Sequence, residues 1–203
     1  MTAFNSSDVT KSFCVSLPLN AHRLPYLPLI QKLSALPGFH FTEIDQAFIV
    51  WGAITLAIFS LGQFSPLSWT TQAVLDAALT GAGIATTSGL TWALASQAKL
   101  RWVIFLWAGL MAAGPVVTAY GVFFSSVLIL SNLCLLWLGL CAVGYGAMAV
   151  GMRSRCFTAA CLVHFAAMFF LNCTLGCQFF SSGLIMASTL FFFSFVQWDM
   201  QSS

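Results

Sequence analysis

A polar stripe along one apolar segment contains the strongest candidate for chemistry. Asp76, Thr80, Thr87 and Thr91 recur at spacings of four and seven residues, which places them near one face of a helix. Asp76 is the one charged residue well inside an apolar segment and away from its ends, and acids in such positions often belong to ion or proton paths. The stripe therefore predicts a transport path. The alternative is an acid near the membrane surface that is solvated or bonded to a Ser or Thr.

His164 is the second candidate, because it lies in the middle of another apolar segment. An imidazole there can ligate haem, chlorophyll or a metal. A haem held by two His ligands needs a second intramembrane His, but His22 and His40 both lie near the N-terminus. The simpler expectation is a neutral His164 bonded across helices, for example to Asn132, with no cofactor bound. The residues on the same helical face are Cys161, Met168 and Asn172.

Small residues also recur every fourth position in the segment that holds Asp76. This spacing lets helix backbones approach closely and is the small-xxx-small packing signature of membrane helices. We expect this ladder to pack against another helix, most simply one of the same chain, although the spacing fits a helix of another chain equally well. The members of the ladder are Ala77, Gly81, Ala85, Gly89 and Ala93.

Catalytic signatures are missing from the sequence. It has no HExxH, GxSxG, P-loop or Rossmann glycine pattern. The paired carboxylates Glu43 and Asp45 stand two residues apart, so on a helix they point in different directions. Acids there suit a helix N-terminus, where the dipole favours negative charge. An enzyme is therefore disfavoured.

Composition identifies lipid as the solvent of most of the chain. Of its 203 residues, 60% are hydrophobic and 6% are charged, against roughly 25% charged in soluble domains. The net charge of +2, without any basic run, argues against nucleic acid as a partner.

Six apolar segments are long enough to cross a bilayer as helices, which takes about 20 residues each. The sequence therefore predicts an all-α, polytopic membrane bundle over residues 44–203. Residues 1–43 are expected to form a polar segment, in which a short amphipathic helix after Pro28 lies on the membrane surface. The expected spans are Ile44–Gly62, Thr71–Ser96, Trp102–Phe124, Val127–Gly151, Cys156–Gly176 and Phe179–Trp198.

Positive charge predicts the orientation of these spans. With six spans, all seven Lys and Arg residues fall on one side of the membrane, which the positive-inside rule makes the cytoplasmic or stromal side. Both termini are expected on that side. The membrane itself is either a bacterial plasma membrane or a thylakoid or other organellar membrane. The basic residues are Lys11, Arg23, Lys32, Lys99, Arg101, Arg153 and Arg155.

Three functions remain open on these grounds. The first is a non-enzymatic subunit, assembly factor or organiser of a larger membrane complex, bound to other membrane proteins or to copies of itself. Very short loops, the small-residue ladder and 20 Phe residues favour it. The second is a small-solute or ion transporter that uses Asp76 and the Thr stripe. The third is an intramembrane redox protein with a haem or pigment at His164.

Overall fold

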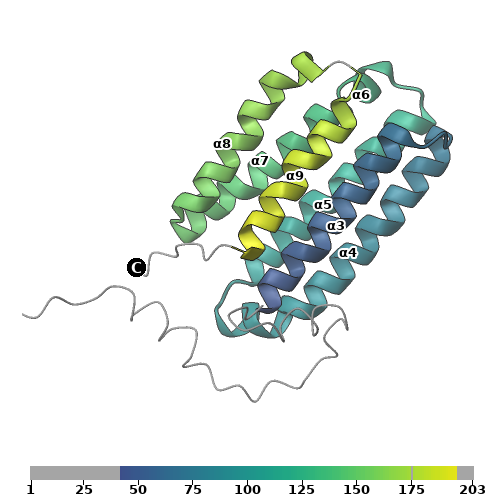
Figure 1. Ribbon diagram of the computed structural model, residues 1–203. Helices are drawn as coiled ribbons and strands as arrows, with labels where there is room; N and C mark the ends of the chain where they lie inside the picture. Colours follow the sequence, from purple (N-terminus) through teal and green to yellow (C-terminus); the bar gives the residue numbers. More distant parts are fainter. Residues whose placement is uncertain (1–41, 175, 196–203) are drawn as a thin grey trace, which may run out of the picture. The chain divides into compact units, whose positions relative to one another are not determined.

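The computed structural model describes residues 42–174 and 176–195, which form α-helices, one 3-10 turn and no strand. These helices belong to one compact unit, His40–Ser203, and Figure 1 shows them bundled side by side. The all-α prediction is confirmed, while the predicted amphipathic helix after Pro28 lies outside the described residues. In chain order the elements are α3 (Glu43–Phe64), α4 (Trp69–Gln97), α5 (Arg101–Phe123), α6 (Val127–Ser131), α7 (Leu133–Met152), α8 (Arg155–Phe170), η1 (Leu171–Thr174) and α9 (Gln178–Phe195).

Four of these helices, α3, α5, α7 and α9, are long and apolar enough to cross a membrane. Helix α8 is apolar but has only 16 residues. Helix α4 is the longest, with 29 residues, but Gly, Ser, Thr and Asp76 dilute its apolar character. Each of the six predicted segments overlaps one of these six helices, although the bounds differ by one to six residues.

The helix starts follow local chemistry. At the beginning of α3, the Asp45 carboxylate accepts a hydrogen bond of 2.8 Å from the Thr42 backbone N–H, and the Thr42 hydroxyl accepts one of 3.2 Å from the Asp45 N–H. This reciprocal pair is a capping box, which satisfies two otherwise free backbone donors. The expectation that the acids near residue 43 serve a helix N-terminus is thereby confirmed for Asp45.

Two local features of the apolar segments differ from simple expectation. The segment 127–151 is not one helix, because it breaks at Asn132 into α6 and α7. The Asn132 side-chain amide donates to the Leu128 carbonyl at 2.8 Å and so closes the short helix before it. A proline ordinarily loosens or kinks a helix, but Pro115 lies inside α5, which continues on both sides of it.

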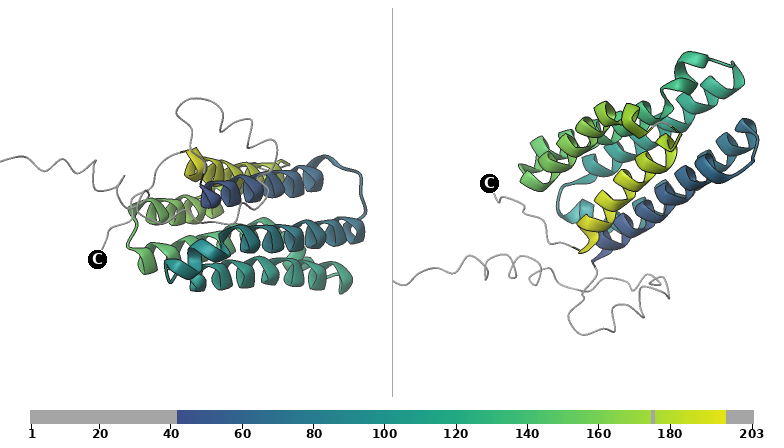
Figure 2. Two further views of the ribbon diagram at one scale, coloured as in Figure 1. Left: turned by 90° about the horizontal axis from the view of Figure 1, so that it is seen from below. Right: turned by 45° about the horizontal axis from the view of Figure 1, so that its top comes forward.

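The helices form a chain of neighbours. Helix α3 packs along α9 and α4, α4 packs on α5, and α5 packs on α7, which also contacts α8 and α9. Helix α8 lies at one edge of the bundle and α4 at the opposite edge (Figure 1). The further views in Figure 2 show α3 running beside α9. The largest fully buried side chains, Tyr145, Phe157 and Leu138, come from α7 and α8.

Glycine brings α3 and α9 close together. A Cβ atom added at Gly183 of α9 would collide with the Cβ of Phe59 on α3, and one at Gly52 of α3 would come within 2.7 Å of the Phe191 ring. The α3–α9 contact therefore depends on the absence of side chains at both glycines.

Candidate functional site

A small pocket lies at the end of the bundle where α3 ends and α4 begins. Five helices line it: the end of α3, the start of α4, the end of α5, and the starts of α7 and α9. The volume open to the centre of a water molecule is ≈ 20 Å³. A single water needs roughly 10–15 Å³ by this measure, so the pocket has room for one group of that size.

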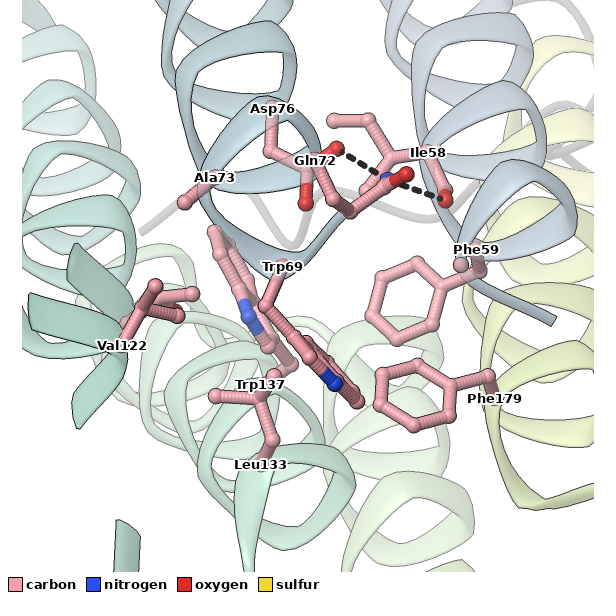
Figure 3. A pocket seen from close by; sticks show the side chains of 12 residues that line it. Ile58, Phe59, Trp69, Gln72, Ala73, Asp76, Val122, Leu133, Trp137 and Phe179 are labelled. Atoms are coloured by element: carbon pink, nitrogen blue, oxygen red, sulfur yellow. Dashed lines mark hydrogen bonds between the residues drawn. The ribbon is translucent and has the colours of Figure 1, made fainter. Parts of the chain in front are cut away.

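Asp76 lies in the wall of this pocket and is half-buried. Its Oδ1 accepts a hydrogen bond of 2.7 Å from the Gln72 side-chain amide, one helical turn away, and the same nitrogen lies 3.4 Å from the Ile58 carbonyl oxygen of α3. Figure 3 shows both contacts. The hydrogen-bond partner of Asp76 is thus Gln72, four residues earlier, and not the Ser or Thr that the alternative to a transport path allowed.

Two buried threonine hydroxyls near this end have no hydrogen-bond partner among the described residues, those of Thr80 and Thr118. Thr80 is 1% exposed and Thr118 is 5% exposed. Thr80 lies 17 residues before Gln97 and Thr118 lies 17 residues after Arg101, so on these antiparallel neighbours they stand at the same height. Thr118 also lines the pocket. A buried hydroxyl without a partner is costly, which makes Thr118 a candidate ligand-contacting group.

Aromatic rings form the remaining walls. The rings of Trp69 and Phe179 have centroids 6.1 Å apart, those of Phe179 and Phe59 6.4 Å, and those of Phe59 and Trp137 6.3 Å. Figure 3 shows these four rings gathered on one side of the Gln72–Asp76 pair. The site thus combines one carboxylate and one unpaired hydroxyl with an aromatic surround.

The rest of the predicted Thr stripe does not join the pocket. The Thr87 hydroxyl donates to the Gly83 carbonyl at 2.8 Å and accepts from the Trp51 indole N–H at 3.1 Å. The Thr91 hydroxyl donates to the Thr87 carbonyl at 2.8 Å. Asp76 lines the pocket and Thr80 lies one turn further into the bundle. Thr87 instead bonds α4 to α3, and Thr91 bonds within α4.

His164 is fully buried in α8, and its neighbourhood differs from the expected one. Its Nδ1 pairs with the Ala160 carbonyl of the same helix at 2.9 Å, while Asn132 bonds to Leu128. The Tyr145 ring lies 5.0 Å from the imidazole, centroid to centroid. The Nε2 atom of His164 has no hydrogen-bond partner among the described residues. The expected cross-helix bond to Asn132 is therefore wrong.

The small-residue ladder of α4 lies on the exposed side of that helix, which contradicts the expectation that it packs inside the bundle. All five members are exposed, and a Cβ at Gly81 or Gly89 would meet nothing within 4 Å. The buried side of α4 instead carries Gln72, Thr80 and Thr87. The spacing identified one helical face correctly, but the face points outward.

The described basic residues lie at the other end of the bundle from the pocket. Lys99 and Arg101 stand at the turn between α4 and α5, and Arg153 and Arg155 at the turn between α7 and α8. The pocket is lined by the start of α4, the end of α5 and the start of α7. These helices therefore separate the acid from the four cations.

Metal chemistry has no visible basis in the described part of the chain, where no group of three or more His, Cys, Asp or Glu is placed to hold an ion.

No protein-family model, curated protein or solved structure matches this chain. Sequence reasoning missed Gln72, Thr118 and the four pocket rings. The i−4 spacing of Gln72 from Asp76 was a usable signal, while the rings come from four different helices.

Proposed function

We propose that this protein is a non-enzymatic, six-span membrane subunit that assembles with other membrane helices through the exposed face of α4. Both termini lie on the side of the basic turns, facing the cytoplasm or stroma. Four helices meet the length and apolarity of a span on their own. Helices α4 and α8 complete six crossings, since α4 packs against α3 and α5, and α8 packs against α7 and α9.

The orientation is supported by the two basic turns at one end of the helices. Lys99, Arg101, Arg153 and Arg155 stand there, and positively charged loops stay on the cytoplasmic side. With six crossings, both the N-terminal and the C-terminal segments share this side. The pocket with Asp76 then opens on the opposite side.

The observation that carries the assembly proposal is the chemistry of the exposed α4 face. Between Val74 and Trp92 this helix exposes no large apolar side chain. Its exposed residues there are Ala77, Ala78, Gly81, Ala82, Ala85, Thr86 and Gly89. Small residues suit close backbone contact with another helix, where packing rather than hydrophobicity drives association.

Helix α8, at the opposite edge, gives the contrast. Its exposed face carries large apolar side chains, including Leu162, Phe165 and Phe169, each more than half exposed. Such side chains fill the space among lipid tails. The two edges of the bundle therefore suit different neighbours, lipid at α8 and a protein helix at α4.

The other two functions have less support. A transport path through the whole Thr stripe conflicts with the bonds that engage Thr87 and Thr91. A cofactor at His164 conflicts with the Tyr145 ring packed against the imidazole.

The test is the native mass in a mild detergent, for the wild type and two matched double variants. Gly81→Leu with Ala85→Leu fills the α4 face, where the fold leaves room. Ala159→Leu with Ala166→Leu adds similar bulk to exposed positions of α8. We expect an assembly well above the 21.9 kDa chain for the wild type and the α8 variant, and a lower mass for the α4 variant. A monomeric wild type, or an α4 variant that keeps the full assembly, would refute the proposal.

A further inference from the structure

We propose that the pocket at the α3–α4 end binds one small ammonium group, –NH₃⁺ or NH₄⁺, through Asp76, Thr118 and the surrounding rings. This is a binding site on the outer side of the protein. It does not depend on assembly through α4.

The charge of Asp76 favours a cation in this pocket. The Asp76 carboxylate is half-buried, and Gln72 is a neutral partner that leaves its charge unbalanced. The nearest basic residues along this hairpin, Lys99 and Arg101, lie beyond Gln97 at the far end of α4. At 1.5 Å per residue that end is about 30 Å away. A cation bound here would balance this half-buried charge, because a charge removed from water is costly without a partner.

The Thr118 hydroxyl favours a ligand that donates hydrogen bonds. The Thr118 hydroxyl lines the pocket, is 95% buried and has no partner among the described residues. An ammonium group carries several N–H donors, so one such group can bond to both the Asp76 carboxylate and the Thr118 oxygen. Charge-assisted hydrogen bonds to a carboxylate are about twice as strong as neutral ones.

The aromatic walls of the pocket also favour a cation. A cation within about 6 Å of a ring centroid is attracted by the negative face of the ring, and Trp is the strongest partner. The neighbouring ring centroids of Trp69, Phe179, Phe59 and Trp137 are 6.1–6.4 Å apart. A group held among them therefore lies close to more than one ring.

Size limits the ligand. The pocket admits the centre of about one water-sized group. Ammonium and the head of a primary amine are of that size, whereas a tetramethylammonium group is much larger. Asp76 lies seven residues into α4, about 10 Å from its first residue. Both a free ammonium ion and the primary amine of a phosphatidylethanolamine headgroup can approach from that side.

The experiment uses the full chain in nanodiscs of phosphatidylcholine, with tryptophan fluorescence as the readout because Trp69 and Trp137 line the pocket. Ammonium and methylammonium chloride are titrated against tetramethylammonium and potassium chloride at equal ionic strength. We expect a saturable change with the first two salts only. Absence of saturation with both, or an equal response to tetramethylammonium, would overturn the proposal.

Variants locate the site. Asp76→Asn should weaken methylammonium binding at least tenfold, and Thr118→Val several-fold. Asp45→Asn makes the same chemical change at the opposite end of the bundle and should leave binding unchanged. If Asp76→Asn does not yield folded protein, Thr118→Val carries the test. Unchanged affinity in the folded variants would overturn the assignment.

Nanodiscs with phosphatidylethanolamine distinguish the two sources of the ammonium group. If the headgroup is the ligand, these nanodiscs shift the tryptophan spectrum without added salt and block the methylammonium response. If free ammonium is the ligand, the titration is the same in both lipids. Either result requires saturable binding that depends on Asp76.

Discussion

The indole N–H of Trp51 on α3 donates a hydrogen bond of 3.1 Å to the Thr87 hydroxyl on α4. The same hydroxyl donates to the Gly83 carbonyl at 2.8 Å. Thr87 is thereby occupied on both sides, and it serves the contact between the two helices. Only the part of the stripe near Asp76 remains available to a ligand.

Loss of this contact should measurably weaken the fold. We expect Trp51→Phe to lower the free energy of unfolding by about 0.6 kcal/mol, the average for hydrogen bonds between membrane helices, and by no more than about 1.7 kcal/mol, their maximum. Thr91→Val is the control, because the Thr91 hydroxyl bonds only within its own helix among the described residues. Unfolding in mixed detergent micelles measures both, and equal losses would contradict the assigned role of the Trp51–Thr87 bond.

Two glycine-to-alanine changes should act in opposite directions. Gly183→Ala places a methyl group against Phe59 between α3 and α9, and such overpacking costs about 1–3 kcal/mol. Gly81→Ala meets nothing within 4 Å and gains up to about 1 kcal/mol of helix propensity. Thermal unfolding is measured on the dissociated protein, in a detergent strong enough to separate subunits. The unfolding temperature should fall for Gly183→Ala and should not fall for Gly81→Ala. A stability loss for Gly81→Ala under these conditions would contradict the outward position of the ladder.

Replacing His164 with Leu should be tolerated. The substitution removes an imidazole whose Nε2 is buried without a partner, so the free energy of unfolding should change by no more than about 1 kcal/mol. Unfolding in micelles and the visible absorption spectrum should both be recorded. A large loss of stability together with loss of visible absorbance would instead indicate a cofactor at this residue.

Cysteine labelling tests the six-span topology. Cys173 and Cys177 are exposed near the start of α9, at the pocket end. After mild reduction, a membrane-impermeant maleimide should label intact cells or vesicles from the outside. The Cys173→Ser, Cys177→Ser double variant should lose this labelling. An Arg153→Cys change in that variant should become labelled only after permeabilisation. Outside labelling of position 153 would reverse the topology.

Hydropathy predicted the helices well, because a run of apolar residues in lipid has to satisfy its backbone hydrogen bonds as a helix. It did not predict the break at Asn132, since one amide side chain in a mostly apolar segment of 25 residues barely changes a hydropathy average. The break follows from a specific bond, from Asn132 to the Leu128 carbonyl.

The direction of the small-residue face was not predictable from spacing. In a soluble helix the apolar side marks the core. In α4 one side carries small residues and the other carries Gln72, Thr80 and Thr87, so spacing alone lets Ala77 and Gly81 fit an internal or an external contact equally well. The site was predictable only in part. Asp76 stood out as a charge, but Thr118 becomes relevant only once the register of α4 against α5 is known.

The most direct test of assembly through α4 is photo-crosslinking in native membranes. A photoreactive amino acid at Ala85 samples what contacts the α4 face, and the same group at Ala166 samples the exposed face of α8. We predict a discrete protein adduct from position 85, larger than the 21.9 kDa chain by the mass of one partner, and no such adduct from position 166. Absence of a protein adduct at position 85, with lipid adducts at both positions, would contradict the account.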